Sequence, residues 1–231
     1  LYLFCIKRRF GEALRDEELR LYAGLFLACA LAVTGILHYA DGLPLADALR
    51  SAAFNTASMQ STTGFTDEDF MTWHPTTWLL LTFVSVFGAC AGSTSGGLKC
   101  VRLLMLWKLT RAEFRQMLHP HAVLPTRIGG ATVTPQMGRT LLAFFTVYIL
   151  LVVLSAIAMS AMDLPLLDAF GLASTSFSNI GPSVGHGVGP LSSWSSLNEA
   201  TLWLNSFLML AGRLEIFSLL LPLTPAFWRD E

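Results

Sequence analysis

Two short polar loops, each built around a glycine, carry residue types that suit the binding of a dehydrated cation. The first has the sequence STTGF at residues 61–65, and the second has the sequence SNIGP at residues 178–182. Glycine reaches positive φ angles at little cost, so it lets the backbone turn carbonyl oxygens toward one point. Such carbonyls replace the hydration shell of potassium in channel filters. A lone loop would favour a simple glycine turn after a helix, whereas two copies at matching places favour a shared ion site.

The two loops occupy matching places in an internal repeat. The sequence LPLADA at residues 43–48 recurs as LPLLDA at residues 164–169, and a moderately apolar block separates each copy from its loop. The blocks, residues 45–60 and 166–178, are too short or too polar to cross a membrane. The second is expected to be shorter by about one helical turn. Both predict re-entrant half-helices whose partially negative C-terminal ends point at the loops.

A third segment, residues 88–97 (GACAGSTSGG), is too rich in glycine and small polar residues to continue as a helix. A phosphate-binding loop would need a lysine directly after its second glycine, whereas Leu98 follows Gly97 and Lys99 comes one place late. The preceding residues also lack a strand pattern. The segment therefore predicts a break in a helix rather than a nucleotide site.

Two charges interrupt the last apolar run of the chain. A charge at membrane depth is costly and tends to face a cavity or a partner, so Arg213 is expected to face a cavity or to hold loop carbonyls. Glu215 lies two residues further on, and its side chain points about 200° away on a helix. We therefore expect Glu215 to form a buried ion pair with Lys99 or another base rather than with Arg213.

The composition indicates that these elements lie in a lipid bilayer. Of the 231 residues, 53% are hydrophobic and 13% are charged, against about 25% charged in a typical soluble domain. Apolar runs of the length that a spanning helix needs predict four spans: residues 21–39, 70–98, 140–162 and 200–228. Non-helical backbone is stable at membrane depth only beside protein or water. The predicted fold is therefore an all-α polytopic membrane protein, made of two repeats of span, re-entrant half-helix, loop and span around an aqueous pathway.

Basic residues indicate which ends of the spans face the cytoplasm, because short loops rich in lysine and arginine stay inside. Every lysine and arginine except Arg50 and Arg213 lies before residue 21, between residues 99 and 139, or after residue 228. The N-terminal segment and the linker between the repeats are therefore predicted to be cytoplasmic. The opposite face is predicted to carry six acidic residues: Asp41, Asp67, Glu68, Asp69, Asp163 and Glu199. This acidic rim either concentrates cations or is merely solvated.

Charge and side-chain type exclude several classes of function. A net charge of -1 offers no basic face for nucleic acid. The four cysteines lack metal-ligand spacing and are expected to be reduced packing residues. His119 and His121 lack a further ligand nearby and are expected in a solvated turn. Because no nucleophile, base and orienting acid form a catalytic set, an enzyme is not predicted. The chain opens at Leu1 within an apolar stretch, and we expect it to be part of a longer protein.

Four stretches resemble the TrkH/TrkG/KtrB superfamily of bacterial potassium-uptake proteins, and they are most similar to its TrkH branch. They follow the family's order and are STTGFTD (61–67), GACAGSTSGGLK (88–99), SNIGPSVG (178–185) and GRLEIF (212–217). The resemblance covers essentially the whole chain, and it implies the third and fourth of four pore repeats. It divides the chain into a juxtamembrane segment (1–20), the third repeat (21–118), a cytoplasmic linker (119–139) and the fourth repeat (140–231).

The resemblance also implies roles for individual residues, with K+ as the transported ion and no cofactor. The selectivity filter would use eight residues: Thr62, Thr63, Gly64, Phe65, Asn179, Ile180, Gly181 and Pro182. Ser183 departs from the family's usual glycine, and we expect it to stiffen the outer end of the second filter strand. An intramembrane loop would obstruct the pore below the filter, with Arg213 projecting toward it: Gly92, Ser93, Thr94, Ser95, Gly96 and Gly97.

The resemblance further implies a bacterial inner-membrane location, a homodimer and a cytosolic ring of nucleotide-binding regulatory subunits similar to TrkA. The basic run at residues 99–115 suits either anionic lipid headgroups or such a regulatory subunit. Two other functions stay open at this point: a membrane enzyme with an anion site at the glycine-rich loop, and a structural membrane scaffold. The sequence does not decide between potassium and sodium, or between a channel and a symporter.

Overall fold

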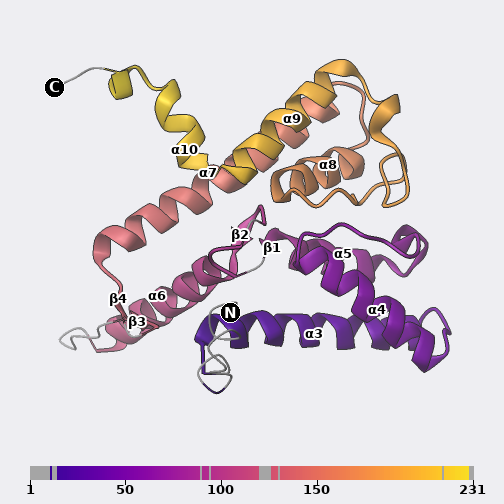
Figure 1. The fold of residues 1–231 in the computed structure, drawn as a ribbon, viewed down its shortest axis with the longest axis horizontal. Helices are drawn as coiled ribbons and strands as arrows, with labels where there is room; N and C mark the ends of the chain where they lie inside the picture. The colour runs from indigo at the N-terminus through magenta and orange to yellow at the C-terminus, as the bar shows by residue number, and fades with distance from the viewer. Residues whose placement is uncertain are drawn as a thin grey trace.

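The computed structural model describes residues 11, 15–88, 90–93, 95–119, 126–129, 131–214 and 216–228. The described chain is mainly helical, with four short strands. Helices α3, α4 and α5 gather at the indigo and purple end of the chain, and helices α7, α8 and α9 form a second group (Figure 1). Strands β1 and β2 lie between the two groups (Figure 1). The molecule is therefore arranged as two helical halves.

The two longest helices each have a long apolar sequence and a capping residue at the N-terminal end. Helix α3 (Glu17–Tyr39) begins where the Asp16 carboxylate accepts hydrogen bonds from the N–H groups of Glu18 and Leu19. Helix α7 (Pro135–Ser160) begins with a proline and is capped by Thr134. Both are long and apolar enough to cross a membrane. They correspond to the predicted spans at residues 21–39 and 140–162.

Two shorter helices have the bounds that the sequence predicts. Helix α4 (Leu45–Gln60) follows Pro44, and helix α8 (Leu166–Ser178) follows Pro165. Proline fixes its own φ near −65° and suits the start of a helix. The helices have 16 and 13 residues, a difference close to the 3.6 residues of one turn. Helix α4 ends at Gln60 and helix α8 ends at Ser178, so each glycine loop comes at the C-terminal end of one of these helices.

The predicted span at residues 70–98 is not one helix. It begins with the 3-10 turn η1 (Phe70–Thr72) and continues as helix α5 (Pro75–Val86), which has only 12 residues. At Phe87 the backbone leaves the helix, with φ −91° and ψ 81°. Strand β1 (Phe87–Gly88) then pairs in parallel with β2 (Leu98–Lys99), and helix α6 (Cys100–Leu118) follows. The glycine-rich segment thus interrupts the apolar run at residues 70–98, and the helix breaks where the composition indicates.

The predicted span at residues 200–228 is also divided, and the expectation of Arg213 inside a continuous helix is wrong. Helix α9 (Glu199–Arg213) ends at this arginine, and helix α10 (Ile216–Leu220) follows. The 3-10 turns η3 (Leu221–Leu223) and η4 (Pro225–Trp228) complete the described chain. Leu214 caps α9, with its N–H donating to the carbonyl of Leu210, and the end of α9 packs on the end of α8 at Gly212.

The remaining elements are a short hairpin between the two halves and a turn within the second half. Strands β3 (Arg127–Ile128) and β4 (Ala131–Thr132) form an antiparallel hairpin between α6 and α7. The 3-10 turn η2 (Trp194–Ser196) precedes α9.

Each half has its own hydrophobic core, and each core contains a residue from the opposite half. Ile180, from the second glycine loop, packs into the core formed around α3, α4 and α5. Leu98, at the end of the glycine-rich segment, packs into the core that contains Phe177 of α8 and Leu208 of α9. The non-helical segments therefore join the two halves.

Phe177 provides a test of this arrangement, because its side chain is 1% exposed and its ring packs edge-on against Tyr148 at 4.7 Å. Phe177→Ala is expected to lower the free energy of unfolding by about 3–5 kcal/mol. Phe170→Ala, on the same helix at a side chain that is 45% exposed, is the control and is expected to have a small effect. Thermal unfolding of the protein produced from its complete gene measures both. Equal losses in the two variants would contradict the assignment of Phe177 to the core.

Candidate functional site

The two glycine loops have positive φ angles at equivalent positions. Thr62 and Asn179 adopt the left-handed conformation, with φ 56° and 57°, directly after or near the ends of α4 and α8. Two residues further on, Gly64 and Gly181 also have positive φ angles, 78° and 107°. A residue other than glycine is strained in these conformations. The chain therefore turns in the same way at both places.

The hydrogen bonds at the helix ends match as well. The N–H of Thr63 donates to the carbonyl of Ser58 at 3.0 Å. At the equivalent position, the N–H of Ile180 donates to the carbonyl of Thr175 at 3.2 Å. The two segments therefore share conformation and hydrogen bonding, which a pair of unrelated glycine turns would not require.

The two loops are in direct contact. A Cβ atom added at Gly64 would overlap the carbonyl oxygen of Ile180 and lie 3.2 Å from Cδ of Pro182. A Cβ atom added at Gly181 would meet no described atom within 4 Å. Ile180 is buried, whereas Phe65 is 69% exposed. The backbone of the first loop thus packs against the second, and of the predicted filter residues this contact brings together Gly64, Ile180 and Pro182.

The segment that follows each loop is tied to the preceding half-helix by a hydrogen-bonded acid. In the first copy, Asn55 of α4 donates to the carboxylate of Asp67 at 2.6 Å. In the second copy, the buried carboxylate of Asp168 in α8 accepts from the N–H groups of His186 at 3.0 Å and Gly187 at 2.9 Å. Asp67 was predicted only as part of an acidic rim, and the role of Asp168 was missed because its donors lie about twenty residues away.

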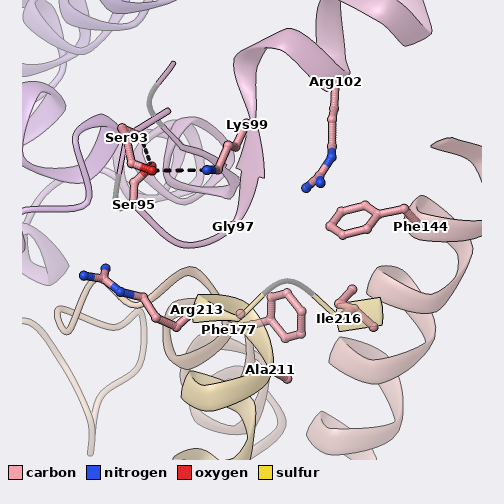
Figure 2. A pocket seen from close by; sticks show the side chains of 11 residues that line it. Ser93, Ser95, Gly97, Lys99, Arg102, Phe144, Phe177, Ala211, Arg213 and Ile216 are labelled. Carbon is pink, nitrogen blue, oxygen red and sulfur yellow. Dashed lines mark hydrogen bonds between the residues drawn. The ribbon is translucent and has the colours of Figure 1, made fainter. Parts of the chain in front are cut away.

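The glycine-rich segment forms a loop whose ends are fastened together. Strands β1 and β2 pair Phe87 with Leu98 and Gly88 with Lys99. Inside the loop, the Lys99 ammonium donates to the carbonyl of Ser93 at 3.1 Å, and the hydroxyls of Ser93 and Ser95 are 2.8 Å apart (Figure 2). Of the predicted gate residues, Thr94 lies outside the described residues.

This loop lies directly against the base of the second glycine loop. A Cβ atom at Gly96 would be 2.6 Å from the carbonyl oxygen of Ser178 and 2.9 Å from Nδ2 of Asn179. A Cβ atom at Gly97 would be 3.3 Å from Oγ of Ser178. The approach is therefore one of backbone against backbone, and side chains at Gly96 and Gly97 would prevent it.

The end of helix α9 approaches the same point from another side. A Cβ atom at Gly212 would overlap the carbonyl oxygen of Phe177. The Asn179 amide donates to the carbonyl of Met209 at 3.0 Å and lies 3.0 Å from the Cβ position of Gly212. The sequence predicted Asn179 only as a carbonyl ligand. Its amide also joins the second loop to α9, next to the glycine-rich loop.

A cavity of about 180 Å³ lies between the glycine-rich loop and the ends of α8 and α9, and it is lined by three basic residues. Arg213 lies on the same side of the cavity as the Ser93–Ser95 turn, and the guanidinium of Arg102 lies on the other side over the ring of Phe144 (Figure 2). The distance from Cζ of Arg102 to the centre of that ring is 3.9 Å. Arg213 thus lines a cavity, and the stacking of Arg102 on Phe144 had no signal in the sequence.

Some predicted residues lie apart from the site or outside the described chain. Glu215 is outside it, so its pairing with Lys99 stays a prediction, as does the solvated turn at His121. His119 ends helix α6. Within the described ranges, no group of three or more histidine, cysteine or acidic side chains has the geometry to hold a metal ion. The described cysteines are free thiols: Cys29, Cys90 and Cys100.

Comparisons with known proteins agree on one family. A family model described as a cation transport protein, TrkH, matches residues 24–228. The chain is 36% identical over 220 residues to the Trk system potassium uptake protein TrkH of Vibrio parahaemolyticus, a match that covers 94% of this chain and 44% of that protein. It is 33% identical over 230 residues to the Trk system potassium uptake protein TrkI of Halomonas elongata, covering 100% of this chain and 46% of that protein.

Comparison with solved structures also finds a TrkH protein. The fold is similar to the crystal structure of the potassium transporter TrkH from Vibrio parahaemolyticus, with a TM-score of 0.85 and 33% identity. The match covers 94% of this chain and 46% of that chain. The chain therefore spans about half the length of the relatives that it matches.

Gly212 tests the close packing of α9 on α8. Gly212→Ala is expected to lower the free energy of unfolding by about 1–3 kcal/mol, the usual cost of overpacking, because the new methyl group overlaps the Phe177 carbonyl. Gly138→Ala in helix α7 is the matched control, since its Cβ would lie 3.5 Å from Cδ1 of Leu109. Alanine is expected to be neutral or mildly stabilising there, as in other helix interiors. Thermal unfolding that ranks the two variants in the reverse order would contradict this packing.

Proposed function

The chain belongs to the TrkH family of cation transport proteins, and we propose that it supplies half of a potassium-selective pore. The observation that carries the proposal is the pair of glycine loops, which share φ angles and helix-end hydrogen bonds and touch at Gly64 and Ile180. The proposed ligands of K+ are backbone carbonyls of residues 62–65 and 179–182. Two further loops, from a part of the protein beyond this chain, would complete the ring.

The half-helices favour a cation at this point. The C-terminal end of a helix carries a partial charge of about −0.5, and α4 and α8 both end immediately before their loops. The two ends therefore place partial negative charge beneath the proposed ion site. No side chain of formal charge is needed there, which suits an ion that must bind and leave quickly.

We propose that the glycine-rich loop is the gate. Its Gly96 lies against Ser178, directly below the second proposed filter strand. Glycine and serine side chains are small, and the strands that join the two ends of the loop, β1 and β2, have just two residues each. An element of this kind can move without disturbing the helices around it. The proposed blocked state is the one in which this loop packs against the end of α8.

Arg213 is proposed to oppose ion passage below the filter. It lines the cavity next to the glycine-rich loop, together with Lys99 and Arg102. A positive charge beside the route of a cation raises the energy of the ion there, and solvent weakens this effect without removing it. The role proposed for Arg213 is therefore electrostatic, with the planar guanidinium also suited to hold loop carbonyls.

The proposed setting is a bacterial inner membrane, with the N-terminal segment and the β3–β4 hairpin on the cytoplasmic side. The relatives are named as potassium uptake proteins of a Trk system, so we propose that this protein works with other Trk components. A second copy of the chain and a cytosolic nucleotide-binding ring are the proposed partners. The family is one of transporters rather than enzymes, which argues against an enzymatic anion site, and filter-like loops would serve no purpose in a scaffold.

The filter proposal is tested by replacing each loop glycine by serine. Both Gly64→Ser and Gly181→Ser are expected to lower the potassium/sodium flux ratio, because a β-carbon is strained at positive φ. Gly64→Ser is expected to have the larger effect, about tenfold or roughly 1.4 kcal/mol, because its Cβ overlaps the Ile180 carbonyl oxygen whereas Gly181 faces open space. Ion fluxes into proteoliposomes containing the complete protein give the ratio.

Gly42→Ser is the control for backbone strain alone. Gly42 has φ +70° but no described atom within 4 Å of its Cβ position, and it lies in the turn before α4. Its flux ratio is expected to equal that of the wild type. An unchanged ratio in both loop variants would remove these glycines from the filter.

The electrostatic role of Arg213 is tested by changing its charge and its shape separately. Arg213→Ala is expected to increase rubidium uptake by about tenfold, as for a unit charge about 10 Å from the ion path in a medium of dielectric constant near 20. Arg213→Lys keeps the charge and is expected to retain most of the barrier. Arg50→Ala, at a side chain that is 71% exposed on α4, is the control. Equal or lower uptake in Arg213→Ala, at matched protein levels, would make this residue a brace of the fold instead.

A further inference from the structure

Glu18, in the first turn of helix α3, is hydrogen-bonded to both sides of the glycine-rich loop. Its Oε1 atom accepts from the N–H of Ala91 at 2.6 Å and from the N–H of Val101 at 3.1 Å. Ala91 lies near the start of the loop, and Val101 lies just after its end. One carboxylate from a distant helix thus joins the two flanks of the loop.

The N–H of Val101 has no acceptor within helix α6. Val101 is the second residue of α6, and N–H groups in the first turn of a helix have no intrahelical acceptor. The side chain at the N-cap position of a helix usually supplies an acceptor. In α6 the N-cap residue is Lys99, whose side chain makes no capping hydrogen bond, and the first turn of α6 contains no acidic residue. A carboxylate at this end also opposes the positive end of the helix dipole. Glu18 therefore caps α6 from a different helix.

The position of Glu18 is itself fixed. The Asp16 carboxylate accepts from the N–H of Glu18 at 2.8 Å, which holds the first turn of α3. The neighbouring Glu17 forms an ion pair with Lys108 of α6 at 2.6 Å, and Lys108 also donates to the carbonyl of Arg127 in strand β3. Val101 and Lys108 are seven residues apart, so they lie on one face of α6. The start of α3 therefore contacts α6 at two successive points.

We propose that Glu18 is a positioning residue that latches the glycine-rich loop in its blocking conformation. The proposal rests on the proposed function of that loop as the gate. Inside the loop, Lys99 and the paired serines hold the backbone locally, whereas Glu18 ties its flanks to α3. Loss of the carboxylate leaves two N–H groups without their acceptor, and this destabilises the blocking conformation relative to open ones. Lys108 also links the β3–β4 hairpin to the first turn of α3, because it forms an ion pair with Glu17 and donates to the carbonyl of Arg127.

The test compares three variants of the complete protein in proteoliposomes. Glu18→Ala removes the acceptor and is expected to increase basal rubidium flux by about tenfold, the scale of hydrogen bonds to a charged group. Glu18→Gln keeps a carbonyl oxygen in the same place and is expected to stay within about threefold of the wild type. Glu113→Ala removes an exposed acid from α6 and is expected to have no effect. An Ala variant with wild-type flux, or a Gln variant as leaky as the Ala variant, would overturn the latch.

A second readout follows the loop itself. In protein that retains the buried Cys100, whose thiol donates to the carbonyl of Gly88, but lacks its other natural cysteines, Ser93→Cys is expected to react with a charged thiol reagent about tenfold faster when Glu18→Ala is also present. If Glu18→Ala does not fold, Val101→Pro removes one of the two donors at a position where the first turn of a helix tolerates proline, and the same increase is expected. Unchanged reactivity in the folded variant would contradict the latch independently of ion flux.

Deletion of residues 93–95 separates the latch from the gate. In one outcome, the deletion variant has increased flux, whereas Glu18→Ala has the flux and the labelling rate of the wild type. This outcome would reject Glu18 as the latch and support the loop as the gate. In the other outcome, the deletion variant has wild-type flux, whereas Glu18→Ala shows faster labelling at residue 93. This outcome would reject the loop as the gate, although Glu18 would still hold the loop in place.

Discussion

The arrangement of the site depends on close backbone packing around the C-terminal end of helix α8. Gly96 and Gly97 of the glycine-rich loop approach Ser178, and Gly212 of α9 approaches Phe177. At each of these positions a β-carbon would overlap or crowd its neighbour. The second glycine loop begins at this same end of α8, so its position, that of the glycine-rich segment and that of the cavity beside Arg213 are set by one set of contacts.

Such packing leaves many backbone groups outside regular helices, and these groups need partners in an apolar environment. Side chains supply several of them from distant parts of the chain. Lys99 donates to Ser93, and the thiol of Cys100 donates to the carbonyl of Gly88. Asn179 donates to Met209, and Glu18 accepts from the flanks of the loop. The non-helical segments are thus held by a few polar side chains, which is compatible with one of these segments moving.

The sequence predicts those features that have local causes. Leu-Pro before α4 and α8, and the glycine loops after them, mark both helices to their bounds. The glycine content of residues 88–97 marks the break after α5. The end of α9 at Arg213 was missed, because the apolar run in the sequence continues beyond it to residue 228. The contacts of Glu18 and the stacking of Arg102 join residues far apart in sequence, so no pattern of spacing predicts them.

The central claim is that the two glycine loops contribute carbonyl oxygens to one potassium site. Its most direct test is an anomalous-scattering map of crystals of the complete protein grown with rubidium, which replaces potassium and can be located by its own signal. We expect rubidium density between the loops, within coordination distance of backbone oxygens in both residues 62–65 and residues 179–182. Rubidium density that contacts only one loop, or lies elsewhere while both loops are well ordered, would contradict a shared potassium site.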